Sequence, residues 1–134
     1  MKQLAVLGPP IGQALSPVLH RAAYQALGLD WNYRAIDCTP GRLAAFLAGL
    51  DDGWAVLSLT MPLKRTAVPS LDEVSQTVEA TGTANTVTVR GDRLLGENTD
   101  VDGMLHALRD AGITWVEWAC VLGVGATAAT ALLS

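Results

Sequence analysis

Short apolar runs alternate with amphipathic segments along the chain, and glycine or proline marks almost every change. Short apolar runs bounded by such residues are typical of buried strands. Strands are therefore predicted at residues 4–7, 31–36, 55–59, 84–89, 93–95 and 118–122. The fourth and fifth of these flank a short Arg90-Gly91-Asp92 turn and are predicted to form a hairpin.

Helices are predicted between the strands from their start and stop signals. Ser16-Pro17 and Thr39-Pro40 each place a capping residue before a proline at the first helical position. The segment Ser70–Glu73 matches a capping box, which predicts a helix from there to about Ala80. A further helix is predicted over 101–110. The first helix carries its apolar positions on one face: Leu19, Ala22, Ala23, Ala26 and Leu27.

Strands that alternate with helices predict the α/β class, a three-layer α/β/α arrangement around a mostly parallel sheet. Residues 1–100 would form this domain and 101–113 a connecting helix. Residues 114–134 would begin a second unit, the start of a Rossmann-type dinucleotide-binding domain, in a sequence that we expect to be truncated. We expect that last segment to be poorly packed or docked elsewhere, because one strand and one short helix cannot bury their own apolar faces.

Composition narrows the classes of partner. Half of the residues are hydrophobic, 16% are charged and the net charge is −4, which is unsuited to binding nucleic acid. Cys38 and Cys120 have neither metal-ligand nor disulfide-framework spacing, so reduced thiols in a cytoplasmic protein are expected. The apolar stretch at 120–133 is shorter than the ~20 residues that a membrane span requires. No membrane partner and no signal peptide are therefore expected.

Two segments after predicted strands could bind or act on a ligand, because ligands of open α/β sheets lie at the carboxyl ends of strands. In Gly8–His20, a helix N-terminus could receive a carboxylate beside Ser16, although Ser16 alone is more simply a helix cap. In Ser58–Lys64, Lys64 follows a strand directly and could exchange a proton with a ligand. Taken alone, Lys64 is more simply explained as a solvent-facing lysine at the start of a loop.

Two further segments supply polar groups and glycines. Asp100, at the end of Gly96–Asp100, could cap the following helix or pair with Lys64. Asn85 both donates and accepts hydrogen bonds, which suits a polyol, unless it is only a turn residue. The sequence Val121–Ala128 has the G-x-G-x-x-A pattern after an apolar run, so its glycines could let a pyrophosphate approach a helix start.

Taken together and in order, these segments resemble the shikimate dehydrogenase family. The family pattern G-x-P-I-x-H-S-x-S-P-x-x-H corresponds to Gly8–His20, and V-T-x-P-x-K corresponds to Leu59–Lys64. The patterns A-x-N-T and G-x-N-T-D correspond to Thr83–Thr86 and Gly96–Asp100, and the glycine loop follows at Gly123–Thr127.

The resemblance implies the reversible, NADP-dependent reduction of 3-dehydroshikimate to shikimate, in the chorismate pathway of aromatic amino-acid synthesis. It makes Lys64 and Asp100 the catalytic pair, with no metal. Its remaining assignments are Ser16, Thr60 and Asn85 as substrate contacts, and Gly123, Gly125 and Ala126 as contacts of NADP, with NAD possible. The partner would be this small molecule, and the protein a monomer or homodimer.

The sequence departs from the family pattern at three places. Gln13-Ala14 stands where the family has His-Ser, Ser58 stands for an asparagine, and one glycine of the loop is replaced. A related enzyme that uses quinate, or a non-catalytic substrate-binding fragment, therefore stays open as an alternative. A purely structural α/β protein would require all four segments to be coincidences.

Overall fold

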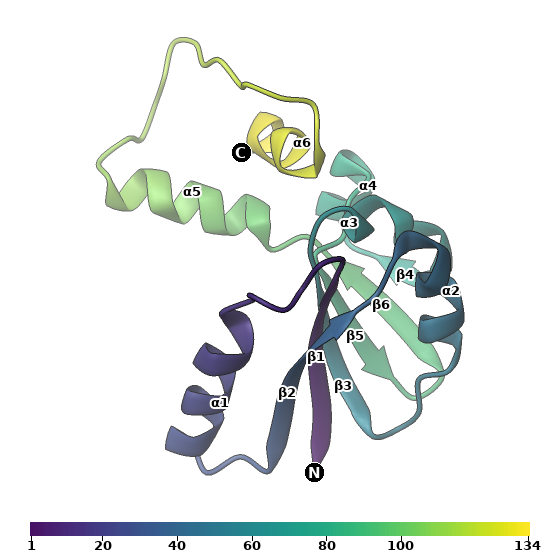
Figure 1. Cartoon of the computed structure of the whole chain (residues 1–134). Helices are drawn as coiled ribbons and strands as arrows, with labels where there is room; N and C mark the ends of the chain where they lie inside the picture. Colours follow the sequence, from purple (N-terminus) through teal and green to yellow (C-terminus); the bar gives the residue numbers. More distant parts are fainter.

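The computed structural model describes residues 1–134 and contains one six-stranded sheet in the order β2-β1-β3-β5-β6-β4 (Figure 1). The strands are β1 (Lys2–Gly8), β2 (Trp31–Asp37), β3 (Trp54–Leu59), β4 (Glu73–Val74), β5 (Thr86–Arg90) and β6 (Arg93–Glu97). β1 pairs in parallel with β2 and β3, and β4 pairs in parallel with β6, while β5 is antiparallel to both of its neighbours. Only β5 runs against the common direction, so the predicted mostly parallel sheet and its hairpin are confirmed.

Helices and loops connect the strands. The helices are α1 (Ser16–Ala26), α2 (Pro40–Ala48), α3 (Leu63–Thr66), α4 (Gln76–Thr81), α5 (Asp100–Asp110) and α6 (Ala126–Leu133), and a 3₁₀ turn covers Val68–Ser70. Both α1 and α2 carry a proline in their first turn, as the sequence predicts. None of the helices combines the length and apolar character needed to cross a bilayer.

Alternate residues of β1 face opposite layers of the molecule. Ala5 and Leu7 belong to a core shared with α2 and α3. Leu4 and Val6 belong to a second core, which contains Tyr24 of α1. The period of two in the strand thus buries both of its faces, and the three-layer α/β/α prediction is confirmed.

The apolar face predicted on α1 forms but is not buried in this chain. Leu19 is 68% exposed, and only Pro17 and Tyr24 of the helix are buried. Tyr24 anchors the helix by packing edge-on against Trp31 of β2. Helical periodicity identifies an apolar stripe, whereas tertiary structure decides whether another element covers it.

The helix predicted from Ser70 to about Ala80 is wrong in its first half. Residues Glu73–Val74 form β4, and α4 begins only after Ser75, whose hydroxyl accepts a hydrogen bond from the Val78 amide. The cause is the pairing of β4 with β6. Next to β4, the Asp72 backbone N–H donates to the Leu94 carbonyl, and the Asp72 carboxylate accepts the Leu94 N–H. A long-range ladder therefore overrides the local capping signal.

The strand predicted at 118–122 is also absent. Residues 113–125 have no helix or strand, and the side chains of Trp118 and Leu122 are almost fully exposed. An isolated strand has no neighbour here with which to pair its backbone N–H and C=O groups. In contrast, α6 lies beside α4 and α5, at the end of the loop that arches over the molecule in Figure 1.

The two cysteines are expected to differ in reactivity. Burial raises the pKa of the Cys38 thiol, whereas Cys120 is exposed. Because the thiolate is the reactive form, iodoacetamide at pH 8 should alkylate Cys120 in the folded protein and Cys38 only after unfolding. Mass spectrometry of the labelled peptides measures both sites. Equal labelling rates in the folded protein would contradict the buried position of Cys38.

Candidate active site

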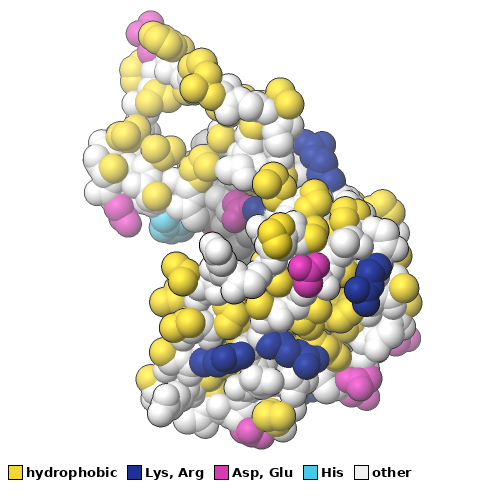
Figure 2. All heavy atoms as spheres, in the orientation of Figure 1, with side chains coloured by type: hydrophobic (Ala, Val, Ile, Leu, Met, Phe, Trp, Pro, Cys, Tyr) yellow, Lys and Arg dark blue, Asp and Glu magenta, His cyan; other side chains and the backbone are white.

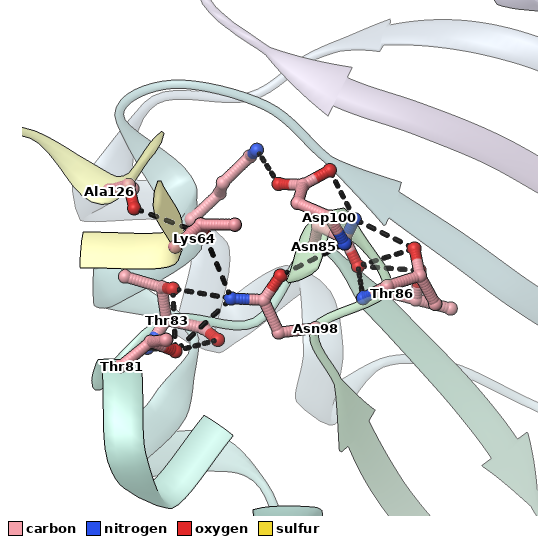
Figure 3. Close-up of polar contacts among 10 residues, drawn as sticks. Lys64, Thr81, Thr83, Asn85, Thr86, Asn98, Asp100 and Ala126 are labelled. Carbon is pink, nitrogen blue, oxygen red and sulfur yellow. Dashed lines mark hydrogen bonds and ion pairs between the residues drawn. The ribbon is translucent and has the colours of Figure 1, made fainter. Parts of the chain in front are cut away.

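Lys64 and Asp100 form an ion pair where the sheet ends and α5 begins. Lys64 lies on α3 just after β3, and Asp100 is the first residue of α5. The Lys64 Nζ donates to the Asp100 Oδ2 at 2.5 Å, and the two side chains are 16% and 33% exposed (Figure 3). Partial burial shields this pair from the screening that weakens ion pairs in open solvent. The predicted meeting of these two residues is confirmed.

Asn85 holds the other carboxylate oxygen of Asp100. Its Nδ2 donates to the Asp100 Oδ1 at 2.8 Å and to the Thr99 Oγ1 at 2.9 Å. Its Oδ1 accepts from the Thr99 backbone N–H at 3.1 Å and from the Thr86 hydroxyl at 2.9 Å. The carboxylate therefore has a fixed orientation, while Lys64 donates to no other protein group and keeps two N–H bonds for a ligand.

Thr60 stands between two cavities at the carboxyl ends of β1 and β3. Its backbone N–H donates to the Leu7 carbonyl at 3.0 Å, which ties the two strand ends together. One cavity, of about 280 Å³, is lined by Thr60, Ser16 and Ala14 among others. The other, of about 250 Å³, is lined by Thr60, Lys64 and the glycine loop. Figure 2 shows acidic and basic side chains together where the two lobes of the molecule meet.

Ser16 does not cap α1. The capping position is Leu15, Ser16 is the first helical residue, and no side-chain cap is made. The backbone carbonyl of Ser16 contacts the His20 ring nitrogen at 2.8 Å, whereas its hydroxyl has no partner in the protein. The cap interpretation is therefore wrong, and the hydroxyl is free to contact a ligand in the cavity that it lines.

Aromatic and hydroxyl side chains of α1, β2 and β3 pack against one another near the first cavity. His20 stacks on Tyr33 with the ring centres 4.1 Å apart, which gives His20 a structural role. The Tyr33 hydroxyl donates to the Ser58 Oγ at 2.8 Å. Burial raises the pKa of Tyr33, and its hydrogen bond to Ser58 partly offsets that rise. Tyr33 therefore stays protonated, and its hydroxyl donates a hydrogen bond to the oxygen of Ser58.

The glycine loop faces Lys64 across the second cavity. Gly123 has φ +126°, a conformation that favours glycine, and a Cβ at Gly125 would meet nothing. α6 starts directly afterwards at Ala126, without a side-chain cap or an acidic residue in its first turn. This helix start therefore leaves backbone N–H groups free for an anion.

Two neighbours of the predicted site residues were not singled out from the sequence. Thr99 bonds Asn85 through its backbone and hydroxyl, and the Asn98 Oδ1 accepts the Asp100 N–H at 3.1 Å. Both belong to the polar run between β6 and α5, which is the signal that could have identified them. Nowhere do three or more His, Cys, Asp or Glu side chains come together as a metal-ligand set.

The fold and this site define a small α/β ligand-binding domain with a lysine–carboxylate pair at the edge of its sheet. Residues 6–87 match the family model described as the shikimate dehydrogenase substrate binding domain. The chain belongs to this family.

Relatives and solved structures agree with that family. The NADP-dependent shikimate dehydrogenase of Methanothrix thermoacetophila is 48% identical over 94% of this chain and 46% of its own length. The Thermus thermophilus enzyme is 40% identical over 93% of this chain and 48% of its own length. Its crystal structures with shikimate, and with NADP(H) and shikimate, superpose with a TM-score of 0.90 at 38% identity, covering 97% of this chain and 50% of theirs. The chain thus spans about half the length of these relatives.

Substitution of Gly8 tests how closely the strand end packs against Thr60. A Cβ at Gly8 would overlap the Thr60 methyl group and lie 3.2 Å from Ile11, whereas a Cβ at Gly12 has open space. Gly8→Ala should therefore lower the free energy of unfolding by about 1–3 kcal/mol, and Gly12→Ala should change it by less than about 0.5 kcal/mol. Urea unfolding of both variants measures this. Equal stability of the two would show that Thr60 is not tightly held.

Proposed function

We propose that the protein carrying this chain is an NADP-dependent shikimate dehydrogenase, which interconverts 3-dehydroshikimate and shikimate. The observation that carries the proposal is the Lys64–Asp100 pair, held by Asn85 beside two cavities at the end of the sheet. The names of the relatives and the shikimate bound in the Thermus thermophilus structure support the same substrate.

Lys64 and Asp100 would act at the carbinol of the substrate. Reduction of a ketone adds a hydride to carbon and a proton to oxygen, and oxidation removes both. Lys64 would donate that proton to the carbonyl oxygen and take it back in the reverse direction. Asp100 would keep the amine in place through the bond at 2.5 Å. Asn85 would hold Asp100 in place, and a ring hydroxyl of the substrate would contact the Asn85 amide by replacing one of its bonds to Thr86 or Thr99.

Ser16 and Thr60 would bind the remainder of the substrate. The free Ser16 hydroxyl and the N-terminus of α1 together favour a carboxylate in the adjoining cavity. Thr60 lies between that cavity and Lys64, so one molecule can extend past it from the carboxylate to the carbinol. Ala14 contributes no hydroxyl to the cavity, which leaves Ser16 as its hydroxyl donor on this loop.

The glycine loop fits the pyrophosphate of a dinucleotide. Gly123, Gly125 and Ala126 combine a positive φ, open space and an uncapped helix start in front of Lys64. NADP, when bound, supplies or accepts the hydride. Residues 114–134 would then be the beginning of a Rossmann-type domain, linked by 101–113 to the substrate domain at 1–100. The two unbridged cysteines are consistent with a cytoplasmic location.

Replacing Lys64 tests the catalytic assignment. In the complete protein, Lys64→Ala should lower kcat for NADP⁺-dependent shikimate oxidation by about 10²–10⁴-fold, because proton transfer loses its partner. The control is Arg65→Ala, which removes an exposed cation from the same short helix and should leave kcat unchanged. Initial rates of NADPH formation, followed by absorbance, give kcat for the parent protein and for both variants. Similar kcat values for both variants would remove Lys64 from the reaction.

Replacing Ser16 tests the carboxylate site. A hydrogen bond to a charged group contributes about 1.5–3 kcal/mol, so Ser16→Ala should weaken shikimate binding roughly 10- to 100-fold. The uncharged methyl ester of shikimate should lose much less affinity through the same substitution. Calorimetric titration of both proteins with both ligands, and with quinate, measures this. Equal losses for acid and ester would place the carboxylate elsewhere.

A further inference from the structure

Four polar residues from three separate segments of the chain form a buried cluster behind the Lys64–Asp100 pair. Thr81 ends α4, Thr83 precedes β5, Asn98 lies between β6 and α5, and Thr130 lies on α6. Asn98 is 3% exposed and Thr130 is 1% exposed. Figure 3 shows the amide nitrogen of Asn98 directed toward Thr81 and Thr83.

The Asn98 amide joins these segments through both of its polar atoms. The two N–H bonds of its Nδ2 are shared among three hydroxyl oxygens, those of Thr83 at 2.9 Å, Thr81 at 3.1 Å and Thr130 at 3.3 Å. Its Oδ1 accepts the backbone N–H of Asp100 at 3.1 Å. The Asn98 side chain therefore contacts both the backbone of Asp100 and α6, the helix that follows the glycine loop.

The direction of the hydrogen bonds requires a donor at position 98. The Thr130 hydroxyl donates to the Ala126 carbonyl at 3.3 Å, so its oxygen is left to accept from Asn98. The Thr81 hydroxyl donates to the Thr77 carbonyl at 2.7 Å, and Thr83 donates to Thr81. No buried side-chain polar atom is without a partner. A fully satisfied network of this kind has a single arrangement.

Thr130 is the only buried residue of α6, although most of that helix is apolar. The polar link to Asn98 is therefore the buried contact between α6 and the substrate domain within this chain. Hydrogen bonds are directional, whereas apolar packing permits sliding, so this link favours one position of α6 relative to Asn98. The start of α6 and the glycine loop line the cavity that contains Lys64.

We infer that Asn98 is a positioning residue that fixes the glycine loop relative to the Lys64–Asp100 pair, acting through Thr130 on one side and the Asp100 backbone on the other. The inference rests on the proposed function, since it assigns the link a purpose in aligning cofactor and substrate. It adds a role for two residues, Asn98 and Thr130, that do not line the cavity beside Lys64.

Thr130→Val and Thr130→Ser, made in the complete protein, form the matched pair that tests this. Valine keeps the shape but cannot accept from Asn98, whereas serine keeps the hydroxyl. We expect Thr130→Val to lower kcat roughly 10- to 100-fold by misalignment and to raise the dissociation constant of NADP⁺. Calorimetric binding of shikimate without cofactor should stay unchanged. Thr130→Ser should restore kcat and NADP⁺ binding.

Amide hydrogen exchange supplies a readout that does not depend on turnover. Thr130→Val should speed exchange across residues 126–133, and Thr130→Ser should not. Asn98→Asp, which replaces the donor by an acceptor, should speed exchange there and at the start of α5 as well. If that variant does not fold, the Thr130 pair still decides the inference.

Three outcomes would overturn the inference. In the first, Thr130→Val has the same amide exchange rates and the same NADP⁺ affinity as the parent protein. In the second, Thr130→Val and Thr130→Ser speed exchange and weaken NADP⁺ binding to the same extent. Shikimate affinity could also fall along with NADP⁺ affinity, which would indicate general loosening. A parent protein that does not oxidise shikimate would instead refute the proposed function, and the exchange measurements would still report on the link between Asn98 and Thr130.

Discussion

The arrangement of the site depends on the half-buried carboxylate of Asp100 and on the two groups that bind it, one charged and one neutral. Asp100 is bonded by the Lys64 amine on one oxygen and by the Asn85 amide on the other. Removing a charge from water is unfavourable unless it is paired and hydrogen-bonded, so the pair and the amide must be assembled together. Sheet topology makes this possible. β3 and β6 both run against β5, so their carboxyl ends and the start of β5 lie at the same edge.

That edge also explains why the residues come from such distant parts of the chain. Lys64 follows β3, Asn85 precedes β5 and Asp100 follows β6. The antiparallel hairpin reverses β5, which places its first residue, rather than its last, beside the ends of its neighbours. A fully parallel sheet would have moved Asn85 to the opposite edge. The antiparallel strand is therefore a requirement of the site as well as a feature of the fold.

The substrate domain and α6 share a buried polar contact. Leu132 and Leu133 of α6 are exposed, whereas Thr130 is enclosed with Asn98 and two further threonines. An apolar contact contributes through its area, while a buried amide bonded to hydroxyls specifies one position. Such a contact would hold α6 in a fixed position, and the proposed reaction between two bound molecules would require that alignment.

The sequence by itself determined the class of fold and predicted that Lys64 and Asp100 would meet. Proline and glycine signals located α1, α2 and most strands, because these signals act over neighbouring residues only. Lys64 and Asp100 follow predicted strands and Asn85 lies near the start of one, and the structure places all three at one edge of the sheet. Tertiary structure decided the remainder. Pairing with β6 turned Glu73–Val74 into a strand, and the lack of a partner strand left 118–122 without one. The bonds of Asn98 depend on how three distant segments are oriented, and hydrogen bonds of that kind leave no periodic pattern in a sequence.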